Sequence, residues 1–115
     1  MRRMYRSKGD IMDAQMKRGF LEMCVLASLQ ERDSYGYQIV KDVPDILGLT
    51  ESTLYPLLKR LEKAECLTAY SVEHNGRLRK YYRLMPAGEE RIAEFLSEQA
   101  DIMSIYDFVK RGAHA

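Results

Sequence analysis

Residues 50–64 read Thr-Glu-Ser-Thr-Leu-Tyr-Pro-Leu-Leu-Lys-Arg-Leu-Glu-Lys-Ala, and this stretch decides the fold. Its leucines recur at spacings of three and four residues, which on a helix gathers them into one apolar stripe about 100° wide. The leucines are Leu54, Leu57, Leu58 and Leu61. The pattern predicts a helix with one face buried in the core.

The opposite face of this helix carries small hydroxyls at its start and bases further along. Ser52, Pro56, Lys59 and Lys63 point away from the leucine stripe, and Tyr55 lies on its flank. These residue types suit a helix end that enters a DNA groove. An ordinary amphipathic helix with a solvated basic face has the same pattern, so the neighbouring segments must decide between the two interpretations.

A shorter helix is predicted just before this one, over residues 35–43, with Ser34 as its N-cap. The segment Leu47-Gly48-Leu49-Thr50 then combines a helix stop, a turn and a new N-cap. Two helices joined by a short turn that contains glycine, the second with bases on its outer face, form a helix-turn-helix.

After residue 64 the periodicity changes from helical to strand-like. Residues 67–72 and 78–84 are rich in strand formers, and Asn75-Gly76 between them is a strong signal for a tight hairpin turn. Arg77 and Arg79 would share one face of the hairpin, and Lys80 would lie on the other. A two-stranded ribbon is marginally stable alone and must pack against the helices. The sequence therefore predicts a winged helix-turn-helix, with the hairpin as the wing.

Two further helices are predicted at the ends of this domain. Residues 10–29 carry a wide apolar face, and Pro86 begins a last helix that continues to about residue 110. About 24 residues at 1.5 Å per residue give a length of roughly 36 Å, more than a small winged domain can cover. Part of the last helix is therefore expected to meet a second copy of the chain, related by a two-fold axis.

The predicted fold class is α+β and mostly helical. Its organisation is a flexible basic arm at residues 1–9, a winged helix-turn-helix DNA-binding domain at residues 10–84 and a long C-terminal dimerisation helix at residues 85–111. A length of 115 residues is one domain by the usual prior.

Charge is informative through its distribution. Lys and Arg number 18 against 17 Asp and Glu, so a net charge of +1 gives no global argument for a polyanionic partner. Residues 77–83, however, hold four bases and no acid, whereas residues 89–107 hold six acids and one base. The molecule should have a basic end and an acidic end.

Cys24 and Cys66 lie in apolar runs, which indicates buried free thiols in a reducing compartment. No segment reaches the roughly 18 apolar residues of a membrane span. We therefore expect a cytoplasmic protein without membrane contact.

Catalytic chemistry finds little support. His74 lies in the hairpin and His114 in the tail, and the sequence places neither beside a nucleophile. No metal-ligand spacing such as Cys-x-x-Cys and no glycine-rich phosphate loop is present. We predict no catalytic residue, no metal and no cofactor, and hence a protein that is not an enzyme.

Three stretches resemble the signatures of PadR-type transcriptional regulators. They are Tyr35-Gly36-Tyr37, the run from Ser52 to Glu62 and Arg79-Lys80-Tyr81-Tyr82, and the resemblance spans about residues 10–110. The single C-terminal helix is similar to the compact branch of that family. The resemblance implies a homodimeric winged-helix repressor that binds a palindromic operator in double-stranded DNA. It also implies that the first and last helices form the dimer interface, near which an aromatic or drug-like effector binds.

Site residues follow from the pattern and the resemblance together. The predicted DNA contacts are Ser52, Thr53, Tyr55, Pro56, Lys59, Arg77, Arg79 and Lys80. The predicted dimer interface contains Met16, Phe20, Met23, Phe95, Ile102, Met103 and Tyr106. Because the chain has no Trp, a pocket that stacks a flat ligand is expected to use Met12, Met16, Phe20, Tyr106 and Phe108.

The chain departs from the family pattern at two places. Glu65 stands where a glycine usually follows the third helix, and a positive φ there would cost about 1 kcal/mol unless the helix ends differently. Met85 stands where a threonine usually caps the last helix, which would weaken that helix start by about 1 kcal/mol. Pro56, near the sixth position of the third helix, should bend it.

One alternative function stays open from the sequence. A winged-helix protein-interaction module that binds no DNA could use the same basic face for an acidic partner.

Overall fold

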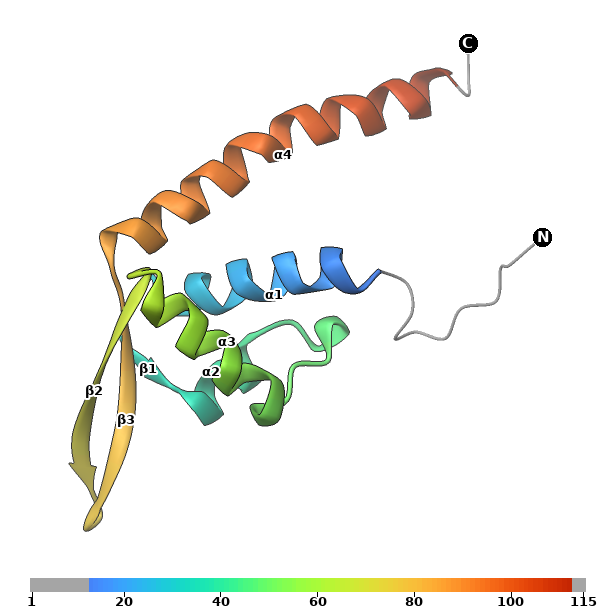
Figure 1. Ribbon diagram of the computed structural model, residues 1–115. Helices are drawn as coiled ribbons and strands as arrows, with labels where there is room; N and C mark the ends of the chain where they lie inside the picture. The colour runs from blue at the N-terminus through green and yellow to red at the C-terminus, as the bar shows by residue number, and fades with distance from the viewer. Residues whose placement is uncertain (1–12, 113–115) are drawn as a thin grey trace.

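The computed structural model describes residues 13–112. A helical body holds a small antiparallel sheet at one side, and the last helix extends away from both (Figure 1). In chain order the elements are α1 (Ala14–Ala27), β1 (Ser34–Tyr35), α2 (Gly36–Asp42), the 3-10 helix η2 (Asp45–Leu47), α3 (Glu51–Lys63), β2 (Leu67–His74), β3 (Arg77–Leu84) and α4 (Pro86–Gly112). The predicted α+β, mostly helical winged helix-turn-helix is confirmed.

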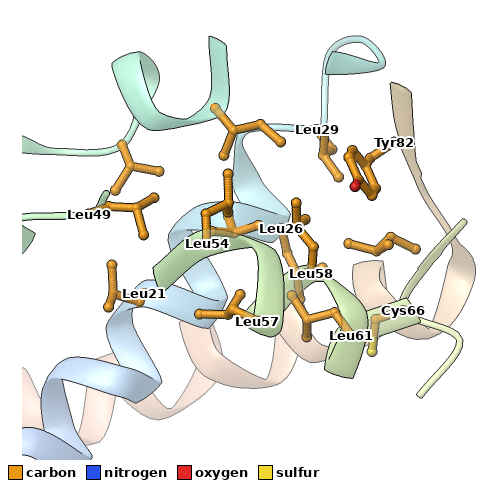
Figure 2. Close-up of a cluster of buried hydrophobic side chains, with 14 of the residues drawn as sticks. Leu21, Leu26, Leu29, Leu49, Leu54, Leu57, Leu58, Leu61, Cys66 and Tyr82 are labelled. Atoms are coloured by element: carbon orange, nitrogen blue, oxygen red, sulfur yellow. The ribbon is translucent and has the colours of Figure 1, made fainter. Parts of the chain in front are cut away.

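The leucine stripe of α3 is the centre of the core. Leu54, Leu57, Leu58 and Leu61 are each at most 3% exposed. Figure 2 shows these side chains gathered against α1, with Leu21 and Leu49 at one end of the cluster and Leu29 and Tyr82 at the other. Replacing one such leucine by alanine typically costs about 2–5 kcal/mol. The cluster joins α1, α2, η2, α3 and the sheet into one body.

The turn between α2 and α3 contains one more element than the sequence predicted. Pro44 precedes the short helix η2, which Gly48 ends with a left-handed φ of 62°. Thr50 caps α3 as predicted, because its hydroxyl accepts a hydrogen bond from the Thr53 amide at 3.4 Å. The tight turn fixes the direction from which α3 leaves the body.

Ser34 was predicted to cap α2, and this prediction is wrong. Ser34 lies in β1 opposite Tyr82, and the N-cap of α2 is Tyr35, which makes no side-chain capping bond. The pairing of β1 with β3 holds Ser34 in extended backbone one residue before the cap position. The sequence missed β1 because a strand of two residues has no periodicity.

The wing is the predicted two-residue hairpin. Asn75 and Gly76 both have positive φ, 52° and 78°, which is the geometry of a type I′ turn. His74 faces Arg77 across the turn, and the register continues in pairs to Leu67 and Leu84. With β1 added, the sheet order is β1-β3-β2. In Figure 1 the wing points away from α4, so the basic hairpin and the acidic helix occupy opposite ends.

α3 ends in a left-handed residue that is not glycine. Glu65 has a φ of 62°. The Cys66 amide donates to the Leu61 carbonyl at 2.9 Å, and the Glu65 amide donates to the Glu62 carbonyl at 2.9 Å. These two bonds define a Schellman motif with glutamate at the position that normally favours glycine. The departure at Glu65 therefore changes the residue and leaves the helix end as the family pattern predicts it.

α4 begins close against the end of α3 and then loses contact with the body. A Cβ added to Gly88 would clash with the Cys66 carbonyl oxygen, and the Met85 amide donates to the same oxygen at 3.0 Å. Of the 27 residues of α4, only Gly88 and Ile92 are buried. The described chain measures 63 × 31 × 21 Å with a radius of gyration of 17.4 Å. A compact chain of this length would have a radius of about 13 Å.

None of the helices in residues 13–112 combines the length and the apolarity needed to cross a bilayer.

Glu65→Gly should stabilise the protein. The left-handed conformation costs a non-glycine residue about 1–2 kcal/mol, more than the roughly 0.5–1 kcal/mol that glycine adds to the unfolded-state entropy. We expect a gain of about 0.5–1 kcal/mol and a rise of a few degrees in the midpoint of thermal unfolding.

Glu62→Gly is the matched control, because the same substitution inside α3 should destabilise by about 1 kcal/mol. A Glu65→Gly variant that melts at or below the parental temperature would show that Glu65 is not strained.

Candidate nucleic-acid interface

The outer face of α3 is free of the core and carries the predicted reading residues. Ser52, Thr53, Pro56 and Lys59 are all exposed. Thr53 also takes part in the helix cap, since its hydroxyl accepts from Thr50 Oγ1 at 3.3 Å. Ser52 and Lys59 thus lie on the solvent side of the helix, with the leucine stripe on the other.

Tyr55 is held more firmly than a freely exposed reading residue. Its ring lies against the backbone of Gly36, where an added Cβ would clash with the phenol oxygen and ring carbons. Burial raises the pKa of Tyr55, and the nearby Glu51 carboxylate raises it further. The phenol therefore stays protonated and can donate a hydrogen bond, while its side chain remains 45% exposed.

The wing cations lie on two faces of the hairpin, as predicted. Arg77 is exposed next to the turn. The Arg79 guanidinium lies 4.2 Å from the ring centre of Tyr35, and Lys80 Nζ lies 5.8 Å from that of Tyr82. These cation–π contacts hold Arg79 and Lys80 over tyrosine rings of the sheet, in β1 and β3 respectively, whereas Arg77 lies next to the turn.

Asp33 anchors the wing to the body, a role that the sequence analysis missed. The Tyr70 hydroxyl and the Arg83 Nε both donate to Asp33 Oδ2, the latter at 3.1 Å. The hydrogen bond from Tyr70, followed by the bond and charge of Arg83, holds the pKa of Asp33 below its usual range. Asp33 lies in a polar break of the sequence, and nothing local indicates partners 37 and 50 residues away.

A second carboxylate joins three helices. Glu22 on α1 accepts from Arg60 Nη2 of α3 at 3.1 Å, and Arg91 Nη1 of α4 approaches its other oxygen at 3.8 Å. The pairs are half-exposed and individually weak. They nevertheless bring Arg60 of α3 and Arg91 of α4 to the same carboxylate on α1.

The predicted dimer and effector residues lie mainly at the surface. Phe20 and Phe95 meet edge to face at 5.8 Å between ring centres, which joins α1 to the first part of α4. Met16, Ile102, Met103, Tyr106 and Phe108 are 44–68% exposed, and Met23 packs at the edge of the core. In Figure 1 the C-terminal half of α4, the segment that contains Tyr106 and Phe108, rises away from α1. Met12 lies outside the described residues.

The part of the chain that the structure describes contains no candidate metal site. Within residues 13–112, no three His, Cys, Asp or Glu side chains are placed to hold a metal ion. Cys66 is buried and Cys24 half-buried, and both are free thiols. Burial raises the pKa of Cys24, which keeps its thiol protonated and unreactive.

A helix-turn-helix with an exposed hydroxyl-and-base face and a basic wing is the architecture of a winged-helix DNA-binding protein. The family model described as the transcriptional regulator PadR-like family matches residues 25–94. The chain belongs to this family of DNA-binding transcriptional regulators.

Individual relatives agree with this assignment. An uncharacterised protein from Lysinibacillus sphaericus is 34% identical over 100 residues, which cover 83% of this chain and 92% of the relative. A crystal structure from Streptococcus mutans UA159 is 40% identical, covers 83% of this chain and 90% of its own, and superposes with a TM-score of 0.72. A PadR family transcriptional regulator from Eggerthella lenta is 34% identical, with coverages of 78% and 80% and a TM-score of 0.67.

Asp33→Asn should destabilise the protein in a pH-dependent manner. The folded protein lowers the pKa of Asp33, so its ionised carboxylate stabilises the fold above the ordinary carboxyl pKa, and that contribution is lost as the pH falls through the folded value. We expect the difference in melting temperature between parent and variant to be larger at about pH 7 than at about pH 3.

Asp101→Asn, which changes an exposed carboxylate on α4, is the control for the loss of one charge. If Asp33→Asn lowered the melting temperature equally at both pH values, the ionised carboxylate of Asp33 would not be what its contacts with Tyr70 and Arg83 stabilise.

Proposed function

We propose that the protein is a cytoplasmic homodimeric repressor that reads a palindromic operator and is released by a small aromatic or drug-like effector. The observation that carries the proposal is the unpartnered apolar surface of α4, which continues far beyond the body that carries the reading helix. A second copy of the chain bound to that surface by two-fold symmetry would give two winged domains, each with its own DNA-contacting helix; each such domain is called a head below.

The operator contacts are assigned to two elements of each head. Ser52, Thr53, Tyr55, Pro56 and Lys59 of α3 would enter the major groove, where exposed hydroxyls and bases at the start of a helix meet base edges and phosphates. The wing residues Arg77, Arg79 and Lys80 would contact the backbone or the minor groove. Two heads about 34 Å apart would match half-sites one helical turn apart.

The dimer interface is assigned to α1 and α4. Exposed large apolar side chains of α4 that support this assignment are Leu96, Ile102, Met103, Ile105, Tyr106, Phe108 and Val109, and α1 adds Met16 and Phe20. A single soluble domain rarely leaves so much contiguous apolar surface in water. Met23 and Phe95 would lie where this surface reaches the body.

The effector is assigned to the same region, where α1 and α4 of the two copies would meet. Met12, Met16, Phe20, Tyr106 and Phe108 supply the aromatic faces and adaptable thioethers that stack a flat ligand. Release requires the effector to prefer one spacing of the two heads, because a ligand with equal affinity for both spacings shifts nothing.

The alternative is a winged-helix module that binds an acidic protein through the same basic face. Binding to DNA from the gene's own promoter, measured as salt is raised, separates the two. A sequence-specific complex that weakens steeply with salt supports the regulator, and equal affinity for random DNA supports the alternative.

Lys59→Ala should weaken operator binding without unfolding the domain. Lys59 is exposed on α3, opposite the leucine stripe, so its loss removes a phosphate or base contact and leaves the core intact. If the contact is to a phosphate, the slope of log K against log salt should decrease by about 1. Lys110→Ala at the end of α4 is the control. Parental affinity and slope in Lys59→Ala would remove Lys59 from the interface.

Ile102→Glu should dissociate the dimer. Ile102 is 51% exposed on α4, and a carboxylate there would be buried without a partner in the interface. Sedimentation velocity at low micromolar concentration should show a single chain for this variant and a dimer for the parent. Ser97→Glu, which lies beside Glu94 and Asp101 on the other side of α4, should remain dimeric. An unchanged mass for Ile102→Glu would refute the interface assignment.

A further inference from the structure

A recess of about 530 Å³ lies between the start of α2, α3 and the base of the wing. Its walls come from three sides, which are residues 35–37, Tyr55 of α3, and Arg79, Lys80 and Tyr82 of β3. These residues come from three segments of the chain, and only the folded domain brings them together. From the sequence, DNA contacts are predicted separately for Tyr55, Arg79 and Lys80, and none is predicted for Tyr35 or Tyr37.

The charges around the recess select an anion. Its lining includes two cations and no carboxylate. Lys41 adds a third cation at the rim, with its Nζ 5.3 Å from the ring centre of Tyr37. A cavity at the end of α1, in contrast, has Glu31, Asp33 and Asp42 in its wall. Glu51 lies near Tyr55, so the acceptance of an anion depends on the cations on the other two walls.

The recess offers hydrogen-bond donors to a ligand. Tyr55 is protonated at neutral pH like any phenol, and burial, the charge of Glu51 and a hydrogen bond to that carboxylate raise its pKa further. The Arg79 guanidinium carbon lies 4.2 Å from the ring centre of Tyr35, and this cation–π contact holds the side chain beside the recess. Gly36 makes the recess possible, because any side chain there would displace the Tyr55 phenol. The recess is pre-formed and holds the Arg79 guanidinium beside it, whereas the Tyr55 phenol would turn its proton from the Glu51 carboxylate to an acceptor oxygen of the ligand.

DNA geometry supplies the anion. The major and minor grooves of a duplex are separated by one sugar–phosphate strand. When α3 lies in the major groove and the wing reaches the adjacent minor groove, that strand must pass between them. Resting on the proposed DNA-binding function, we propose that this recess is a clamp for a backbone phosphate of that strand, with Tyr37, Tyr55, Arg79 and Lys80 as its ligands.

The test replaces single phosphates by neutral methylphosphonates in a duplex that the full-length parent protein has selected from a random-sequence library. One replacement per half-site, between the bases contacted by α3 and those contacted by the wing, should weaken parental binding about tenfold or more. In Tyr37→Phe and in Lys80→Gln, binding to the normal duplex should weaken, and the same replacement should have a much smaller additional effect. For Lys80→Gln the slope of log K against log salt should also decrease by about 1.

Lys110→Gln is the matched control for Lys80→Gln, because it removes one lysine charge at the far end of α4. Its binding should be weakened by the same methylphosphonate replacements as that of the parent. Tyr37 is 58% exposed, so loss of its hydroxyl leaves the core unchanged and tests the contact alone. The clamp would be overturned if no methylphosphonate between the two grooves weakened parental binding. It would also be overturned if Tyr37→Phe and Lys80→Gln lost as much affinity as the parent on that replacement. Failure of the parent to select any sequence would instead overturn the proposed DNA-binding function.

Discussion

The burial of the α3 leucine stripe is the constraint on which the rest of the structure depends. Leu54, Leu58 and Leu61 are almost completely excluded from water because α1, α2 and the sheet all close on them. One wide buried stripe leaves only the opposite face of α3 for solvent, and that face carries Ser52 and Lys59. Burial of the leucines in the core therefore also fixes which face of α3 is exposed, and that face carries the predicted DNA contacts.

The helices and the hairpin were predicted well because each is determined by residues that lie close together in the sequence. The Thr50 cap, the type I′ turn at Asn75-Gly76 and the Leu stripe all depend on residues within a few positions of one another. Glu65 shows how far this goes. Its left-handed φ follows from the family pattern even though the residue itself favours other conformations.

What the sequence did not predict depends on residues that are distant in the chain. Gly36 appears in the sequence only as part of a signature stretch, and its partner, the Tyr55 phenol of α3, cannot be inferred from spacing. The same holds for Asp33 with Tyr70 and Arg83. The Ser34 cap failed for the related reason that β1 exists only because β3 returns beside it. A side chain whose role seems clear from its sequence neighbours can thus make its main contacts with residues far away in the chain.

The few contacts that attach α4 to the body link the proposed dimer interface to α3. Beyond the buried Gly88 and Ile92, α4 meets the body mainly through the Phe20–Phe95 contact and the Arg91–Glu22 pair. Glu22 also holds Arg60 of α3, so α3 and α4 share one carboxylate on α1. A change in the angle of α4 would disturb these few surface contacts before it reached the leucine core, because partly exposed ion pairs are much weaker than buried leucine packing. In the proposed dimer, this attachment would allow the spacing of the two winged domains to change while the helix cap, the recess and the Asp33 contacts of each domain stay intact.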